Sequence, residues 1–124
     1  MKNPFENKFI VNFHHADFDG AISGACAKAA FGDNAIYQAF AISKVTPEVL
    51  KIIDDTDLVL LTDIGIDNLY LEQLLPYMQK DKIIIYDHHI NDFSKEIFSH
   101  MPKNTSSVLD EDVCGATLTW YKLL

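Results

Sequence analysis

Short apolar runs of strand length alternate with helix-length segments along the whole chain, and this alternation is the feature that most restricts the fold. We expect strands over residues 8–13, 35–40, 57–61 and 82–86, and helices over residues 20–31, 46–54, 67–79 and 112–124. Alternation of this kind is typical of an α/β domain with a parallel sheet. Because the strands are almost continuously apolar, we expect helices on both faces of the sheet. Residues 91–107 are ambiguous and fit one short strand with loops.

The chain has the size and composition of one folded domain. It has 124 residues, of which 48% are hydrophobic, enough for a single core. No apolar run approaches the ~20 residues that a membrane span needs, and residues 1–8 lack the apolar middle of a secretory signal. We therefore expect no membrane association and a cytoplasmic location. Cys26 and Cys114 lie in small-residue helix patterns, which predicts two buried free thiols.

The charge of the chain argues against non-specific nucleic-acid binding. The net charge is −8, from 18 acidic and 10 basic residues, and every basic residue is a lysine. Non-specific binding depends on neutralising phosphates, and arginine, the usual bidentate phosphate ligand, is missing. A nucleotide substrate remains compatible with this composition, because bound divalent metal ions would offset the local negative charge.

Acidic and histidine residues follow three of the expected strands. The carboxyl ends of parallel strands meet at one edge of a sheet, which is where ligands bind in α/β domains. The residues that should converge there are His15, Asp17 and Asp19 after the first strand, Asp63 after the third, and Asp87, His88 and His89 after the fourth. His14 also follows the first strand, and we interpret it as a neighbour of the site rather than as a ligand.

The convergence of four carboxylates predicts a metal site. Without compensation, their repulsion and desolvation would cost several kcal/mol, whereas two divalent ions would offset it. Carboxylate with imidazole suits Mn²⁺, Zn²⁺ or Fe²⁺ better than Ca²⁺, and Asp63 could bridge two ions. The structural alternatives are that Asp63 is a simple turn residue and that Asp19 only caps a helix beginning at Gly20.

The spacing of these residues resembles the motifs of a known family. His-Ala-Asp-Phe-Asp-Gly at residues 15–20 is similar to the first motif of the DHH phosphoesterase superfamily, Asp63 to the second, and Asp-His-His at residues 87–89 to the third. Residues 115–120 also resemble a segment of oligoribonuclease-type members, so the resemblance covers residues 8–124. The family includes RecJ-type exonucleases, nanoRNases, cyclic-dinucleotide phosphodiesterases and family II pyrophosphatases.

The resemblance implies a Rossmann-like DHH domain, that is, a parallel sheet flanked by helices, in a hydrolase with two metal ions that activate water. Mn²⁺ is the expected cofactor, with Mg²⁺, Co²⁺ and Zn²⁺ as alternatives. By analogy His89 would face a substrate phosphate, and Asp87 would orient a histidine. The ligands implied for one ion are His15, Asp17 and Asp63, and those implied for the other are Asp19, Asp63 and His88.

The resemblance also implies parts that these 124 residues lack. The family has a fourth motif with an aspartate beyond the third, and a C-terminal domain that binds substrate. We therefore expect residues 1–124 to be a single N-terminal domain, completed by a missing C-terminal domain, a partner chain or an oligomer. The expected substrates are phosphodiesters such as short oligonucleotides.

Two other functions remain open at this stage. One is a non-catalytic or incomplete metal-binding fragment, for which exposed apolar groups such as Leu118, Tyr121 and Leu124 would mark a partner surface. The other is a haloacid-dehalogenase-type phosphatase, in which Asp17 would be the nucleophile and Thr62 would serve as its second motif.

Overall fold

The structure is a computed structural model that describes residues 3–40, 46–63, 68–88, 107–109 and 113–124. The expected strands and helices are all present, with ends shifted by a few residues at most. In chain order the elements are β1 (Ile10–His15), α1 (Phe18–Phe31), the 3₁₀ turn η1 (Gly32–Asn34), β2 (Ala35–Phe40), α2 (Pro47–Asp55), β3 (Leu58–Thr62), α3 (Asn68–Gln79), β4 (Ile83–Asp87), β5 (Val108–Leu109) and α5 (Gly115–Leu123).

The strands of the described residues form one parallel sheet in the order β2-β1-β3-β4-β5. From β1 the chain moves to one side to form β2, then returns to the other side of β1 to form β3. The direction of winding therefore reverses between β1 and β3. In doubly wound sheets such a reversal opens a crevice at the carboxyl ends of the two strands, where ligands bind.

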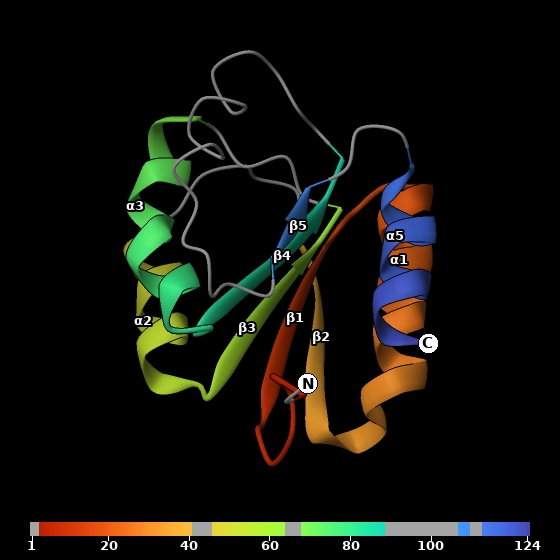
Figure 1. Cartoon of the computed structure of the whole chain (residues 1–124), viewed down its shortest axis with the longest axis horizontal. Coiled ribbons are helices and arrows are strands. Elements are labelled where there is room, and N and C mark those ends of the chain that lie inside the picture. The colour runs from red at the N-terminus through yellow and green to blue at the C-terminus, as the bar shows by residue number, and fades with distance from the viewer. Residues whose placement is uncertain (1–2, 41–45, 64–67, 89–106, 110–112) are drawn as a thin grey trace.

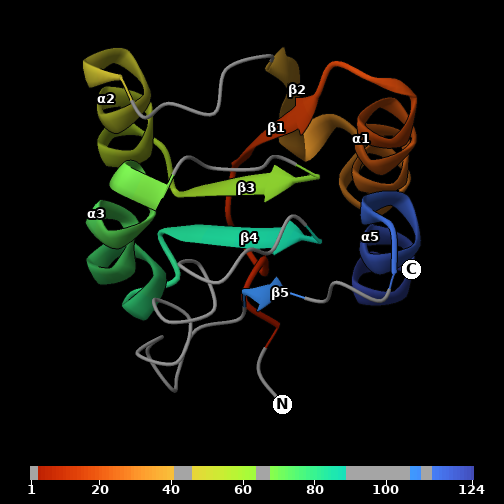
Figure 2. The same cartoon turned by 90° about the horizontal axis from the view of Figure 1, so that it is seen from above.

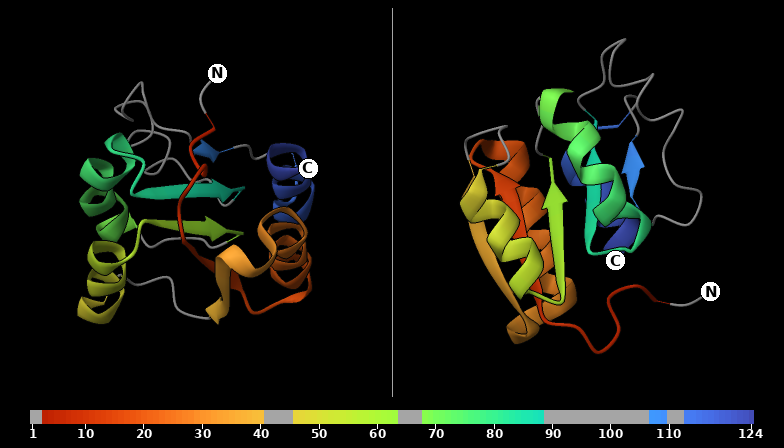
Figure 3. Two further views of the ribbon diagram at one scale, coloured as in Figure 1. Left: turned by 90° about the horizontal axis from the view of Figure 1, so that it is seen from below. Right: turned by 90° about the vertical axis from the view of Figure 1, so that its left-hand side faces the viewer.

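Helices cover both faces of the sheet, as the apolar strands predicted. Figures 1 and 2 show α2 and α3 on one face and α1 and α5 on the other, and the left panel of Figure 3 shows the same three layers. Side chains of β3 alternate between two hydrophobic clusters, with Val59 and Leu61 in one and Leu58 and Leu60 in the other. The α/β class with a parallel sheet flanked by helices is thus confirmed.

The helix ends follow from local chemistry. The side chain of Asp17 accepts the backbone N–H of Gly20 and is the N-cap of α1, so the alternative that Asp19 caps this helix is wrong. Gly32 ends α1 with a φ of 58° and a ψ of −125°, a conformation that glycine adopts without steric cost because it has no Cβ. Thr46 caps α2 as expected, accepting the backbone N–H of Val49 at 3.3 Å.

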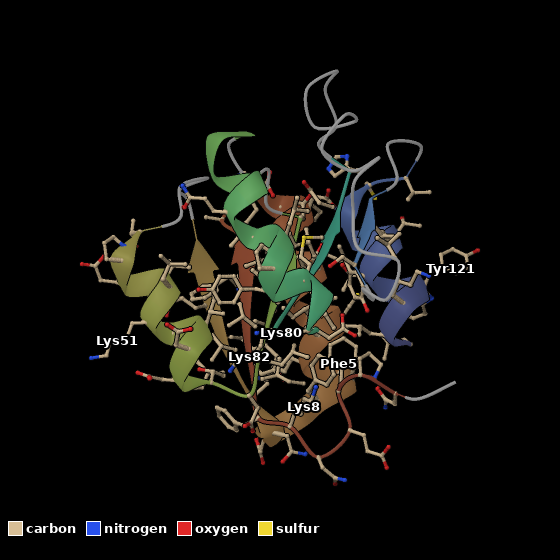
Figure 4. All side chains as sticks on the ribbon, turned by 60° about the vertical axis from the view of Figure 1, so that its left-hand side comes forward. Phe5, Lys8, Lys51, Lys80, Lys82 and Tyr121 are labelled. Carbon is tan, nitrogen blue, oxygen red and sulfur yellow. The ribbon has the colours of Figure 1, made fainter. Side chains whose placement is uncertain are left out.

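Two expectations about side-chain exposure need correction. Cys26 is buried, but Cys114 is exposed, so only one of the two free thiols lies in the interior. Leu118 belongs to the core beneath α5, whereas Tyr121 and Leu124 are exposed. Figure 4 shows the Tyr121 side chain projecting away from the body of the protein. Within the described ranges, the helices are too short or too polar to cross a membrane.

Basic side chains lie toward the amino ends of the strands. Lys8 precedes β1 and Lys82 precedes β4, and Figure 4 shows both away from the strands' carboxyl ends, with Lys80 nearby. The ammonium group of Lys82 donates to the backbone oxygen of Thr56 at 2.7 Å. These cations therefore lie at the opposite end of the sheet from the predicted site.

Candidate metal centre

The candidate residues lie at the carboxyl ends of three neighbouring strands, at one edge of the sheet. His15 is the last residue of β1, Asp63 directly follows β3, and His88 directly follows β4. The strands run in parallel and in register, so these positions lie side by side, and α1 and α5 begin at the same edge (Figure 1). The site therefore occupies the crevice where the winding of the sheet reverses.

Asp63 lies at the centre of the site and is almost fully buried. Its side chain is 1% exposed, and its φ is 57°, a left-handed conformation that aspartate tolerates better than most residues. Its backbone N–H donates to the carbonyl of Tyr86 at 2.9 Å, which fixes the turn at the end of β3 against β4. The aspartate is thus held with its carboxylate facing the crevice between helices and sheet.

Neither carboxylate oxygen of Asp63 receives a hydrogen bond from the residues that the structure describes. Nε2 of His88 lies 2.9 Å from Oδ1 of Asp63, yet the two atoms are not aligned as a hydrogen bond. The pKa of Asp63 is raised to about 6, first by burial and then by the charge of Asp19, while His88 acts in the opposite direction. A buried carboxylate without donors is costly unless a cation is bound to it.

The first group of potential ligands comprises His15, Asp17 and Asp63. One ligand atom from each residue lies within 4.8 Å of the others, and Nδ1 of His15 is 2.8 Å from Oδ2 of Asp17. The backbone N–H of Gly20 donates to Oδ1 of Asp17 at 2.7 Å and lowers the pKa of Asp17, and His15 acts in the same direction. Asp17 therefore has one oxygen fixed by the helix and the other directed to His15.

The second group comprises Asp19, Asp63 and His88, whose ligand atoms also lie within 4.8 Å of one another. Nε2 of His88 is 3.4 Å from Oδ2 of Asp19. Asp19 additionally accepts backbone N–H groups from Gly115 at 3.0 Å and from Ala116 at 2.8 Å. This group is more enclosed than the first, because α5 lies against Asp19.

The two groups share Asp63, and each offers two carboxylates and one imidazole. That donor set fits divalent transition metals, and the buried oxygens of Asp63 accept no hydrogen bond from the described part of the chain. The residues present therefore fit a pair of divalent cations. His14 belongs to neither group; its Nδ1 lies 3.2 Å from the backbone oxygen of His15, and its ring packs beside Gly24.

The third motif is only partly described. Asp87 is the last residue of β4 and is 3% exposed, so it lies in the interior beside the site. His89 lies outside the described residues. The expected roles of Asp87 toward a histidine and of His89 toward a phosphate remain predictions.

Sequence reasoning missed the contribution of α5. The resemblance singled out residues 115–120, but not the contact of Gly115 and Ala116 with Asp19. One signal was a glycine at the start of an amphipathic helix without a polar N-cap residue, since Cys114 makes no side-chain capping bond. Such a helix start needs acceptors from elsewhere in the chain.

The interior around Thr62 does not support the phosphatase alternative. Thr62 is fully buried, and its hydroxyl accepts a hydrogen bond from the side-chain amide of Asn12 at 3.1 Å. A hydroxyl buried in this way is not accessible to a substrate phosphate.

Comparisons with known proteins agree with the motifs. The family model described as "DHH family, N-terminal domain" matches residues 8–124, and a search of curated proteins finds no match. An uncharacterized protein from Helicobacter pylori G27 has a similar structure, with a TM-score of 0.62 and 19% identity over 90% of this chain and 34% of that one.

Exonuclease RecJ bound to manganese is also similar, with a TM-score of 0.54 and 21% identity over 95% of this chain and 33% of that one. At these identities the likeness concerns the fold. This chain spans about a third of the length of both structures. The motif residues gathered around Asp63 agree with the family match over residues 8–124. The chain therefore belongs to the DHH family, and residues 8–124 match the N-terminal domain of that family.

Proposed function

We propose that this chain is the metal-binding domain of a phosphoesterase that hydrolyses phosphodiester bonds with two divalent ions. The observation that carries the proposal is the position of Asp63, which belongs to both ligand groups and is buried with neither oxygen hydrogen-bonded by the described residues. Without ions this arrangement is unfavourable, whereas a carboxylate that bridges two cations is well suited to it.

Each ion has a defined set of protein ligands in the proposal. His15, Asp17 and Asp63 would hold one ion, and Asp19, Asp63 and His88 the other. Mn²⁺ is the proposed metal, with Mg²⁺, Co²⁺ and Zn²⁺ as alternatives; the manganese in the similar RecJ structure supports this choice. Bound together, two such ions supply an activated water and stabilise the charge of the leaving oxygen.

The side chains of the site give it a strong negative charge in the absence of metal ions. The described site residues are acidic or imidazole groups, Lys8, Lys80 and Lys82 lie at the other end of the sheet, and the chain has no arginine. A phosphate would therefore be repelled by Asp17, Asp19 and Asp63 unless cations neutralised them. We infer that substrate recruitment, and not only the chemical step, depends on the ions.

The remaining motif residues would act on the substrate or its neighbours. His89 would donate a hydrogen bond to a phosphate oxygen, and Asp87 would hold a histidine in orientation, as carboxylates beside metal ligands commonly do. The proposed substrates are short oligonucleotides or nucleotides, which the resemblance of residues 115–120 to oligoribonuclease-type members and the likeness to an exonuclease structure support.

Calorimetric titration with Mn²⁺ tests the metal centre. The wild type should bind two ions, and Asp63→Asn should lose both, because one carboxylate serves both groups. Asparagine keeps the size of the side chain and tolerates the left-handed backbone at this position. Asp55→Asn, at an exposed position on α2, is the matched control and should bind two ions. Retention of two tightly bound ions by Asp63→Asn would refute the bridging role.

A cleavage assay with a short oligonucleotide separates the two functional alternatives. Mn²⁺-dependent cleavage that Asp63→Asn abolishes would establish the phosphoesterase. Binding of two ions without cleavage would favour the incomplete metal-binding domain, an outcome to consider because the chain spans about a third of the similar structures.

A further inference from the structure

The carboxylate of Asp19 is joined to the start of α5 through both of its oxygens. Oδ2 accepts the backbone N–H of Gly115 at 3.0 Å, and Oδ1 accepts that of Ala116 at 2.8 Å. Two hydrogen bonds to one carboxylate restrict both its position and its rotation, and bonds to an ionised acceptor are stronger than neutral ones. Asp19 is therefore fixed by a helix that lies 96 residues later in the chain.

The same contact satisfies the start of α5. The first N–H groups of a helix have no partner within the helix, and Cys114, at the N-cap position, makes no side-chain capping bond. The carboxylate of Asp19 supplies the missing acceptor and places negative charge at the positive end of the helix. The contact is thus favourable for both partners.

Gly115 lets the helix start lie directly against the centre of the site. A Cβ atom on this residue would stand 2.4 Å from Cβ of Asp63 and 2.5 Å from its Oδ1. Real Cβ atoms do not approach other atoms so closely, so any larger residue would displace the helix or the aspartate. The absence of a side chain at position 115 therefore permits one helix start to contact both carboxylates of the second ligand group.

We propose that the start of α5, through the backbone N–H groups of Gly115 and Ala116, is a positioning element for the Asp19–Asp63–His88 group. This inference rests on the metal centre proposed above, and it adds Gly115 and Ala116, which are not metal ligands. The two hydrogen bonds occupy only part of the acceptor capacity of a carboxylate, which has about four lone-pair sites. Asp19 can therefore be held by α5 and still offer a lone pair to a cation.

A pair of proline variants tests the positioning by removing one donor. Ala116→Pro deletes the N–H that donates to Oδ1 of Asp19, at a helix position where no N–H is needed within the helix. Thr117→Pro places the same residue one position later in the first turn and leaves both donors to Asp19 in place. A difference in metal binding between the two variants therefore measures the effect of the lost hydrogen bond to Asp19, because both variants contain a proline in the first turn.

The expected readout is selective loss of one ion. In Mn²⁺ titrations, Ala116→Pro should weaken the binding of one ion by about 10- to 100-fold, as other changes beside metal ligands do, and leave the other unchanged. Thr117→Pro should bind both ions as the wild type does. Electron paramagnetic resonance should show the coupled Mn²⁺ pair in the wild type and in Thr117→Pro, and an isolated ion in Ala116→Pro at intermediate Mn²⁺.

A second variant keeps the test valid if Ala116→Pro does not fold, which circular dichroism would reveal. Gly115→Ala places a methyl group against Asp63. This variant should weaken the binding of both ions by about 10- to 100-fold, because both ligand groups include Asp63. Gly24→Ala is its control: the added Cβ would meet the ring of His14 at 2.7 Å, outside both ligand groups, and two ions should still bind.

The outcomes separate this inference from the proposed function. Two ions bound with wild-type affinity by both Ala116→Pro and Gly115→Ala would overturn the positioning role and leave the metal centre standing. Fewer than two ions bound by the wild type would overturn the proposed function itself, and the inference with it.

Discussion

The side-chain amide of Asn12 donates a hydrogen bond to the hydroxyl of Thr62 at 3.1 Å, between neighbouring strands in the interior. The same amide group donates to the carbonyl of Leu60 at 3.0 Å, and Asn12 and Thr62 are both fully buried. Thr62 immediately precedes Asp63, so this polar pair joins β1 to β3 one residue before the centre of the site.

Replacing Asn12 with valine should destabilise the protein by about 1–3 kcal/mol, because the buried hydroxyl of Thr62 loses its donor. Thr62→Val leaves the Asn12 amide short of a partner and should cost a similar amount. The double variant should cost less than the sum, since it removes the amide and the hydroxyl together and leaves neither without the other. Urea unfolding of all four proteins measures the coupling. Additivity within about 0.5 kcal/mol would show that the hydrogen bond contributes nothing specific.

Gly20→Ala should be far more damaging than Gly24→Ala. A Cβ at position 20 would lie 2.0 Å from the backbone oxygen of His15, whereas one at position 24 would meet the ring of His14 at 2.7 Å. Backbone cannot move aside as a side chain can, so we expect Gly20→Ala to cost several kcal/mol. Gly24→Ala should cost less, since the higher helix propensity of alanine offsets part of the strain. Equal losses of stability in thermal unfolding would contradict this ordering.

Gly32→Ala should destabilise the end of α1 by about 1 kcal/mol through the backbone alone. The φ of Gly32 is 58° and its ψ is −125°. Apart from its own chain neighbours, no atom of the described residues lies within 4 Å of the position that a Cβ would occupy, so steric contact with the rest of the described structure is excluded as a cause. Gly32→Asn should cost about as much as Gly32→Ala, because a ψ of −125° lies outside the left-handed helical region that asparagine tolerates. Free energies of unfolding measured for both variants provide the check, and an asparagine variant as stable as the wild type would be the contrary result.

Metal-free protein should lose stability as the pH rises from about 4 to about 6. The pKa of Asp63 is raised from 3.8 to about 6, first by burial, so in this interval the folded state binds more protons than the unfolded state. Stability therefore falls with rising pH, by on the order of 3 kcal/mol in total. Unfolding free energies measured across this range in the presence of a chelator should show the slope, and Asp63→Asn should lack it.

Mn²⁺ should reverse that trend, because an ion that binds the ionised carboxylate of the folded state stabilises it by mass action. At pH 7 the melting temperature should rise with added Mn²⁺, and the rise should shrink as the pH falls below about 6, where Asp63 takes up a proton. A stabilisation by Mn²⁺ that is equally large at pH 4.5 would be inconsistent with Asp63 as a ligand.

Much of the fold was predictable because its signals are local. Apolar runs fixed the four main strands, and the caps at Thr46 and Gly32 fixed helix ends. The order of strands and helices then placed His15, Asp63 and His88 at the same edge of a parallel sheet. The two-residue strand β5 was not predicted, because a strand that short has no periodicity to detect.

The different structural roles of Asp17 and Asp19 could not be predicted from the sequence. Both precede the same glycine and could cap a helix, but α1 begins at Phe18, which makes Asp17 the cap. Asp19 is instead directed toward α5 and accepts from Gly115 and Ala116. Which of two neighbouring carboxylates caps its own helix depends on where that helix begins, and such boundaries are the least certain part of a sequence prediction.

The sequence by itself determined the α/β fold class, the strand ends that bear the acidic and histidine residues, and the family motifs. Only the tertiary structure decided that Asp63 is buried, that neither of its oxygens accepts a hydrogen bond from the described residues, and that α5 holds Asp19. The physical reason is the range of the forces concerned. Strands and helices follow from periodicities of two and 3.6 residues, which any short window contains. The environment of a carboxylate depends instead on packing between segments that lie far apart in the chain.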